Sequence, residues 1–130
     1  MQSNKPRDTL PERALRSAMQ RVGLRFRKHY RALPGMRYTI DAALLGPKVA
    51  VYLNGCFWHG CPAHGSLPKS HTAFWQDKLA RTRYRDFEVD RLLTEAGWLV
   101  VRIWEHEAPF DLSAQRIAEL VRTRRNLLGR

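Results

Sequence analysis

A strongly apolar run that follows a long helical segment constrains this chain more than any other feature of its sequence. The run is Trp98–Trp104, which is rich in β-branched and aromatic side chains and predicts a strand apolar enough to lie near the centre of a sheet. The polarity from about Thr72 to Ala96 is helical, although this segment could break once, and Gly97 ends it. A strand candidate, Val49–Leu53, precedes the helix. Because strand, helix and strand in succession form a crossover, we expect the last strand to pair in parallel with an earlier one.

The remaining elements extend this sheet and cover it. A capped helix is expected from Thr9 to Gly23, and Leu112–Leu128 predicts a final amphipathic helix. Alternating or apolar runs at Leu24–Arg27 and Tyr38–Leu44 predict two further strands, which form an antiparallel meander with the strand candidate named above. The predicted fold class is therefore α/β, with a mixed sheet flanked by helices.

Length and charge limit the classes of function. The 130 residues predict a single domain over 1–130, with residues 1–8 as a flexible N-terminus. The net charge is +11, which favours a polyanionic partner: nucleic acid first, with an anionic membrane surface or an acidic protein as alternatives. No run of eighteen apolar residues and no secretory signal is present, so we expect a cytoplasmic protein with no membrane partner.

A cluster of cysteine and histidine residues predicts a metal site. Cys56, Cys61 and His64 lie within nine residues, and His106 follows the last predicted strand. Four such ligands match a closed, structural zinc site, and their spacing is not that of a DNA-reading finger. The alternative is two buried thiols with solvated histidines. The fourth position is the least defined, because His106 has a glutamate on each side as a competing oxygen ligand.

Four residues have the chemistry of a hydrolytic site, and each also has an ordinary interpretation. Asp41 is a carboxylate in an otherwise apolar strand and is either a ligand for metal or water or an outward-facing aspartate of an edge strand. His59 lies between the two cysteines and suits proton transfer, or is a plain loop histidine or substitute zinc ligand. Glu12 could be a capping-box carboxylate alone. Asp86 could orient a histidine or form a helical ion pair.

Two aromatic residues on the Cys/His segment suggest contact with DNA. Phe57 and Trp58 are either a buried plug or a wedge of the kind that unstacks base steps. The surrounding lysines and arginines can neutralise phosphates and predict salt-dependent binding.

The motif Gly55-Cys56-Phe57-Trp58-His59-Gly60-Cys61, together with Trp98–Glu107, strongly resembles the very short patch repair (Vsr) DNA mismatch endonucleases. The resemblance runs from about Thr9 to His106. It implies a restriction-endonuclease-like core (PD-(D/E)xK type) and a monomeric, Mg²⁺-dependent bacterial enzyme. Such an enzyme nicks duplex DNA 5′ of the thymine in a T:G mismatch left by deamination of 5-methylcytosine. Mismatch-repair proteins are then candidate partners.

The resemblance also implies roles for single residues around the catalytic Mg²⁺. Asp41 falls on the catalytic aspartate that binds Mg²⁺, and Leu53 on a position that supplies a backbone carbonyl ligand. His59 falls on the histidine that activates water and Asp86 on its acidic support. Glu12 matches a glutamate near the metal.

Further residues match the zinc site and the DNA-contacting segment of the family. Four residues fall on or beside the structural zinc positions, where the family mixes Cys and His: Cys56, Cys61, His64 and His106. The residues expected at the DNA are the intercalating Phe57 and Trp58, together with Asn54.

Three departures from the family pattern affect these expectations. Eleven residues precede Glu12, which predicts a short or absent N-terminal clamp and weakens the expectation of mismatch specificity. Asn54 stands where relatives have His or Asp, and Met36–Ile40 replaces the usual Pro or Ala before Asp41. The alternatives are a Vsr-like nuclease of a defence or mobile-element system without mismatch preference, and a catalytically silent, zinc-containing DNA-binding module.

Overall fold

The computed structural model describes residues 9–56 and 70–127. The first helix, α1 (Leu10–Arg21), begins at Thr9, whose hydroxyl accepts a hydrogen bond from the Glu12 N–H. Pro11 lies in its first turn, where the missing N–H has no cost. The predicted flexible N-terminus, residues 1–8, lies outside the described residues.

Within the described residues, four strands form one mixed sheet in the order β1-β2-β3-β4. Their bounds are β1 Arg27–Tyr30, β2 Ile40–Leu44, β3 Val49–Asn54 and β4 Leu99–Trp104. β1, β2 and β3 pair antiparallel, and β3 pairs in parallel with β4 from Val49 opposite Leu99 to Asn54 opposite Trp104. The predicted meander and the predicted parallel crossover are both confirmed.

Two expectations about the strands were wrong. The first strand begins at Arg27, whereas Leu24 and Phe26 precede it and pack against the core. β4 lies at the edge of the sheet formed by the described residues, and not near its centre. Its apolar character has another cause: Leu99 and Val101 pack on the core at one face of the sheet, and Val100 packs on the core at the other. A strand covered on both faces is apolar wherever it lies in the sheet.

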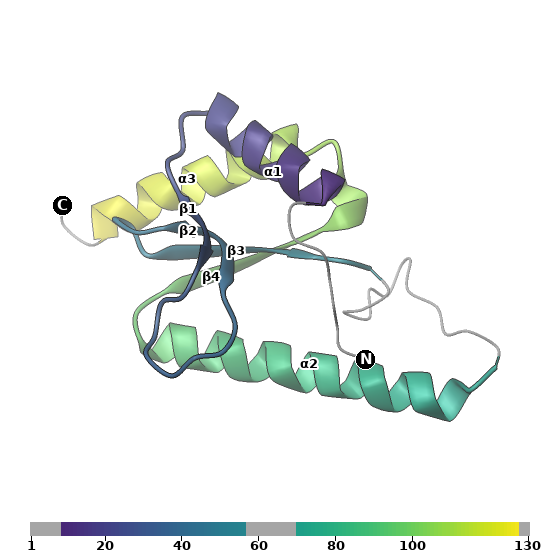
Figure 1. The fold of residues 1–130 in the computed structure, drawn as a ribbon. Coiled ribbons are helices and arrows are strands. Elements are labelled where there is room, and N and C mark those ends of the chain that lie inside the picture. The colour runs from purple at the N-terminus through teal and green to yellow at the C-terminus, as the bar shows by residue number, and fades with distance from the viewer. Residues whose placement is uncertain (1–8, 57–69, 128–130) are drawn as a thin grey trace.

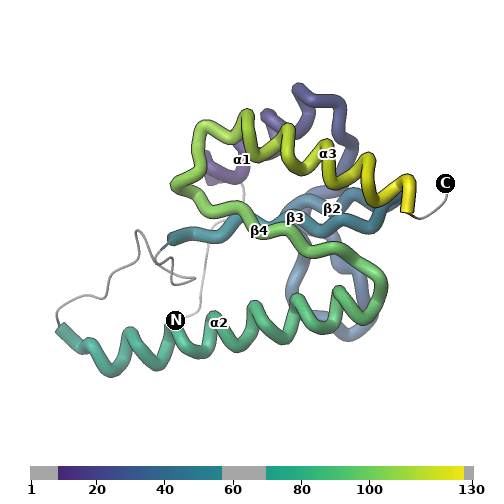
Figure 2. The backbone as a smooth tube through the Cα atoms, turned by 180° about the vertical axis from the view of Figure 1, so that it is seen from behind, coloured from purple at the N-terminus to yellow at the C-terminus, as the bar shows by residue number. Residues whose placement is uncertain are grey.

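In the part of the chain that the structure describes, three helices cover the two faces of the sheet (Figure 1). α1 and α3 (Asp111–Leu127) lie together on one face, where Met19, Ile117 and Val121 pack on strand residues such as Val51. α2 (Thr72–Glu95) lies on the other face, with Val89 and Leu93 against the sheet. The view from behind shows the same three layers (Figure 2).

α2 is the element that extends furthest from the core. It runs unbroken for 24 residues, so the break that the sequence allowed does not occur, and its length is roughly 36 Å. Its N-terminal part continues past the end of the sheet at which β3 and β4 finish (Figures 1 and 2). No helix within residues 9–56 and 70–127 is long and apolar enough to cross a membrane.

Candidate active site

The carboxylate of Asp41 lies half-buried on β2, an interior strand between β1 and β3. Its Oδ2 accepts a hydrogen bond of 2.8 Å from the backbone N–H of Leu53 on β3. The alternative of an outward-facing aspartate on an edge strand is therefore wrong. The structure brings together the two residues that the resemblance assigned to Mg²⁺, because the N–H and C=O of one strand residue face the same neighbouring strand.

Arg102 forms the centre of a polar network on the side of the sheet that faces α2. Its Nη2 lies 2.7 Å and its Nε 3.1 Å from Asp90 Oδ1, and its Nη1 donates to Asn54 Oδ1 at 3.0 Å. Asp86 Oδ1 lies 3.7 Å from the same Nη1, and the guanidinium lies 4.4 Å from the centroid of the Tyr52 ring. The Arg102 guanidinium thus connects β4 both to α2 and to the end of β3.

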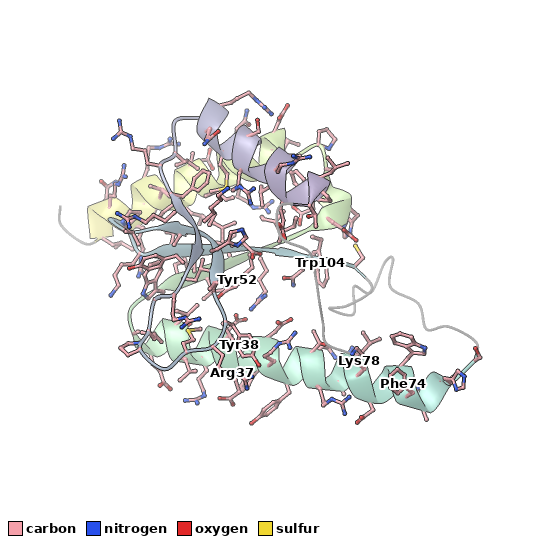
Figure 3. All side chains as sticks on the ribbon, in the orientation of Figure 1. Arg37, Tyr38, Tyr52, Phe74, Lys78 and Trp104 are labelled. Atoms are coloured by element: carbon pink, nitrogen blue, oxygen red, sulfur yellow. The ribbon has the colours of Figure 1, made fainter. Side chains whose placement is uncertain are left out.

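Tyr52 lies between the sheet and α2, and Trp104 lies at the end of the sheet beyond which α2 extends (Figure 3). Within the described part of the chain, the buried Tyr52 hydroxyl has no hydrogen-bond partner. Burial raises the pKa of Tyr52 well above its ordinary value, the Arg102 guanidinium opposes this, and the charges of Asp41, Asp90 and Asp86 add to it. The electrostatic influence of all three carboxylates on one hydroxyl marks an acidic region in a protein whose net charge is +11.

The predicted supporting role of Asp86 is not tested, because His59 lies outside the described residues. Asp86 forms an ion pair with Arg102 on β4. Its side chain is 19% exposed, so most of the side chain is shielded from solvent. Asp86 therefore contacts the sheet through Arg102, whereas Arg91 pairs with Glu88 and Glu95 of its own helix.

Glu12 forms the capping box of α1. Its Oε1 accepts from the Thr9 N–H at 3.2 Å, and its own N–H donates to the Thr9 hydroxyl at 3.4 Å. The predicted capping box is confirmed, whereas the interpretation that Glu12 has no other role is not tested. The residue is 5% exposed, which is an unusual degree of burial for a carboxylate, and its predicted place near a metal stays a prediction.

Two of the four predicted zinc ligands lie in the described residues, and the structure places them in contact. Cys56 Sγ lies 3.2 Å from His106 Nδ1, although 50 residues separate them in sequence. Two ligands of a tetrahedral zinc ion lie roughly 3.5 Å apart, given bonds of about 2.3 Å to sulfur and about 2.0 Å to nitrogen. The pair therefore fits one edge of such a site. Cys61 and His64 lie outside the described residues, as do Phe57 and Trp58.

The two glutamates that flank His106 have other partners. Glu105 Oε1 accepts from the Cys56 N–H at 3.1 Å, which fixes the start of the Cys/His segment. Glu107 accepts from the Trp104 N–H, the Ser113 hydroxyl and Arg116. Burial raises the pKa of Glu107, but these hydrogen bonds outweigh it and the pKa lies below its ordinary value. In this turn, η1 (Glu105–Glu107), Glu105 thus binds the Cys56 backbone and His106 contacts the Cys56 sulfur.

Asp41 and the neighbouring end of β3 offer oxygen atoms that fit a magnesium ion. One of these atoms would come from a side chain and one from the backbone. Among the residues that the structure describes, no three histidine, cysteine or carboxylate side chains gather as a metal-binding group. Asp41 would supply one carboxylate and Leu53 one backbone carbonyl. Mg²⁺ accepts such a set, because it is commonly bound through one or two carboxylates and keeps several waters for itself or for phosphate oxygens.

Arg102, Asp90 and Tyr52 were not recognised from the sequence as site residues. A signal for Arg102 was present, since it is the one charged residue within the apolar run Leu99–Trp104. A buried arginine needs an anionic or polar partner, and this requirement points to carboxylates on a neighbouring element. The sequence does not show which of the many carboxylates of α2 would face it.

Comparison with known proteins agrees with this geometry. The family model described as DNA mismatch endonuclease Vsr matches residues 1–64. The type II nicking enzyme V.NaeI of Lentzea aerocolonigenes is 46% identical over 116 residues, which are 88% of this chain and 70% of that protein. The type II nicking enzyme V.XorIIP of Xanthomonas oryzae pv. oryzae (strain KACC10331 / KXO85) is 37% identical over 115 residues, 88% of this chain and 82% of the relative.

A third relative carries the name of the family. The DNA mismatch endonuclease Vsr of Escherichia coli (strain K12) is 33% identical over 101 residues, which are 76% of this chain and 62% of that protein. The region matched by the family model, residues 1–64, includes both the strand that carries Asp41 and the strand that ends at Asn54. With these relatives and this arrangement of sheet and helices, the chain belongs to the Vsr family and is a DNA endonuclease of the nicking type.

Proposed function

We propose that this endonuclease nicks one strand of duplex DNA at T:G mismatches that arise from deamination of 5-methylcytosine, with Mg²⁺ at Asp41. The observation that carries the proposal is the hydrogen bond between Asp41 Oδ2 and the Leu53 N–H, which holds a carboxylate at a fixed place on an interior strand. Relatives named as nicking enzymes and as a mismatch endonuclease support the reaction type.

The roles of the residues follow from the charge that develops in phosphodiester cleavage. Bound Mg²⁺ would neutralise negative charge on the phosphate oxygens as the attacking water adds. Asp41 and the Leu53 carbonyl would hold it in place, and Asp41 is already oriented by the neighbouring strand. His59 would take the proton of the attacking water. Asp86 would support His59, and Glu12 would lie near the metal.

A structural zinc ion is a second part of the proposal. Cys56, Cys61, His64 and His106 would bind it, and the contact between Cys56 and His106 supports the closure of this segment on the end of β4. Since His59 lies between Cys56 and Cys61, the ion would fix the position of the proposed base.

Metal analysis tests the zinc assignment. We expect about one zinc per chain in the protein as purified, measured by inductively coupled plasma mass spectrometry. Cys56→Ser and Cys61→Ser should each lower this content strongly. Stoichiometric zinc in both variants would exclude the two cysteines as ligands.

A nicking assay tests the mismatch proposal. Labelled duplexes that are identical except for one T:G, C:G, T:A or 5-methylcytosine:G pair are incubated with the enzyme in Mg²⁺ or in EDTA. We expect Mg²⁺-dependent nicking 5′ of the mismatched thymine and at least about a hundredfold lower rate on the matched duplexes. Equal nicking of all four duplexes would instead support the alternative nuclease without mismatch preference, of a defence or mobile-element system. Binding without nicking would support the catalytically silent module.

A further inference from the structure

The environment of Arg102 fixes its guanidinium on several sides. The side chain is 17% exposed, Asp90 binds both its Nε and its Nη2, and the Tyr52 ring lies 4.4 Å away. A planar group held by a carboxylate and by an aromatic ring has little freedom to rotate. The direction in which its remaining nitrogen, Nη1, can donate is therefore set by the fold.

Nη1 donates to the side-chain oxygen of Asn54, and this contact fixes the orientation of the amide. An asparagine amide carries one acceptor oxygen and one NH₂ donor group on opposite sides. Because Oδ1 receives the hydrogen bond from Arg102 at 3.0 Å, the NH₂ group faces away from the guanidinium. Rotation of the amide by half a turn would place NH₂ against a cation, which has no acceptor to offer.

Asn54 also occupies a sensitive position along β3. It is the last residue of this strand, it is 4% exposed, and it directly follows Leu53, whose N–H binds Asp41. Since Leu53 and Asn54 are consecutive residues, a phosphate held at Asp41 would lie near this end of β3. Phosphate oxygens accept hydrogen bonds from asparagine side chains and carry charge that strengthens them.

We propose that Arg102 is a positioning residue of the active site, which fixes the Asn54 amide so that its NH₂ group donates to a phosphate oxygen of the bound DNA strand. This inference rests on the proposed place of catalysis at Asp41. It adds two residues to the site: Arg102, which acts through Asn54, and Asp90, which anchors Arg102.

The competing interpretation is that Asn54 merely satisfies a buried arginine. The two interpretations make opposite predictions for Asn54→Asp. This variant keeps the shape of the side chain and replaces the neutral acceptor of Arg102 by a charged one, so the contact between them is retained or strengthened. It also removes the NH₂ donors and puts a negative charge in their place.

We expect Asn54→Asp to fold with an unchanged or higher Tm and to nick DNA at least about tenfold more slowly under single-turnover conditions. Its Kd for DNA, measured with Ca²⁺ in place of Mg²⁺, should rise as well. A variant that nicks and binds like the wild type would overturn the proposal, because a structural role of Asn54 predicts that result.

A double-mutant cycle tests whether Arg102 acts through Asn54. Arg102→Met should lower the nicking rate about tenfold in the wild-type background, and by less than about twofold in the Asn54→Ala background. Arg102→Lys, which keeps the charge, should recover part of the rate. Equal losses in the two backgrounds would show that Arg102 does not act through the amide. All rates are compared below the temperature at which circular dichroism detects unfolding of the least stable variant.

Arg91→Met serves as the matched control for loss of one positive charge. Arg91 belongs to α2 as Asp86 and Asp90 do, but it pairs with Glu88 and Glu95 on the exposed side of the helix. We expect it to nick at the wild-type rate, and an equal loss in Arg91→Met and Arg102→Met would reduce the effect to net charge. If the wild type nicks no duplex, the proposed function fails, and the inference is decided by binding alone: an unchanged Kd for Asn54→Asp overturns it.

Discussion

At the scale of single residues, Tyr52 places a hydroxyl group in a buried position between β3 and α2. The ring contributes apolar contact and lies against the Arg102 guanidinium, whereas the hydroxyl has no hydrogen-bond partner within the described residues. Burying such a group without a partner costs free energy. The benefit of Tyr52 to the fold therefore comes from its ring.

This cost predicts the effect of removing the hydroxyl. We expect Tyr52→Phe to raise the free energy of unfolding by about 1 kcal/mol at neutral pH, measured by urea denaturation. Burial raises the pKa of Tyr52 in the folded protein, so the folded state keeps the neutral hydroxyl at a pH at which the unfolded chain already ionises it. The free energy of unfolding of the wild type is therefore unaffected by ionisation of this group below about pH 10 and falls as the pH rises further. The difference between the two proteins should then widen above about pH 10. A wild type that is more stable than Tyr52→Phe at neutral pH would contradict this account.

The same scale shows which site residues a sequence can reveal. Asp41 was identifiable because a carboxylate in an otherwise apolar strand needs a reason to be there, and the structure gives it a partner on the next strand. Arg102 gives a comparable signal on β4, because it is a positive charge in an otherwise apolar strand. Its partners Asn54 and Asp90 were not identifiable as such, because their contact depends on how α2 lies over the sheet.

At the scale of elements, the start of α1 places a buried carboxylate in its capping box. Glu12 is the acidic half of a capping box and is also 5% exposed, so its carboxylate lies at the interface of helix and core. A glutamine can form the same capping box, since its side-chain oxygen accepts the same hydrogen bond from the Thr9 N–H. Charge and cap can therefore be separated by one substitution.

We expect Glu12→Gln to change the free energy of unfolding by less than about 0.5 kcal/mol and to lower Mg²⁺-dependent nicking at least about tenfold. Thr9→Ala is the matched control: it should cost about 1 kcal/mol of stability through loss of the cap and leave the nicking rate unchanged. Nicking by Glu12→Gln at the wild-type rate would leave Glu12 as a capping residue alone.

Element boundaries were predictable where the chain carries strong local signals. The capped start of α1 is fixed by Thr9, and the end of α2 lies beside Gly97, whose φ is +94°. The start of β1 was misjudged because the alternation at Leu24 and Phe26 serves packing against the core and not pairing in the sheet. The edge position of β4 was misjudged because coverage by helices on both faces gives an edge strand the composition of a central one.

At the scale of the whole molecule, a mixed sheet with helices on both faces holds parts of the site that are far apart in sequence. Asp41, Asn54 and Arg102 come from β2, β3 and β4, and Asp90 comes from α2. The order of elements was predictable, because a strand, helix and strand in succession restrict the topology to a parallel crossover. The proposed zinc ligands could be named from the sequence as a set, and the structure shows a contact between two of them, Cys56 and His106.

The net charge of +11 predicts how binding depends on salt. Lysines and arginines that neutralise phosphates release counterions, so the affinity for duplex DNA should fall at least about tenfold between about 50 and about 200 mM NaCl. Fluorescence anisotropy with Ca²⁺ in place of Mg²⁺ measures this slope without cleavage. An affinity that does not change over this range would exclude phosphate neutralisation as the main source of binding.

The central claim is that this chain cleaves DNA at Asp41, and one substitution tests it most directly. Asp41→Asn retains an oxygen that can accept the hydrogen bond from the Leu53 N–H, so the fold and the Kd for duplex DNA should stay close to those of the wild type. The amide lacks the charge that would hold Mg²⁺ in the proposed site, and we expect the single-turnover nicking rate on a T:G duplex to fall at least about a thousandfold. Nicking by Asp41→Asn at the wild-type rate would contradict the account and place the reaction elsewhere on the molecule.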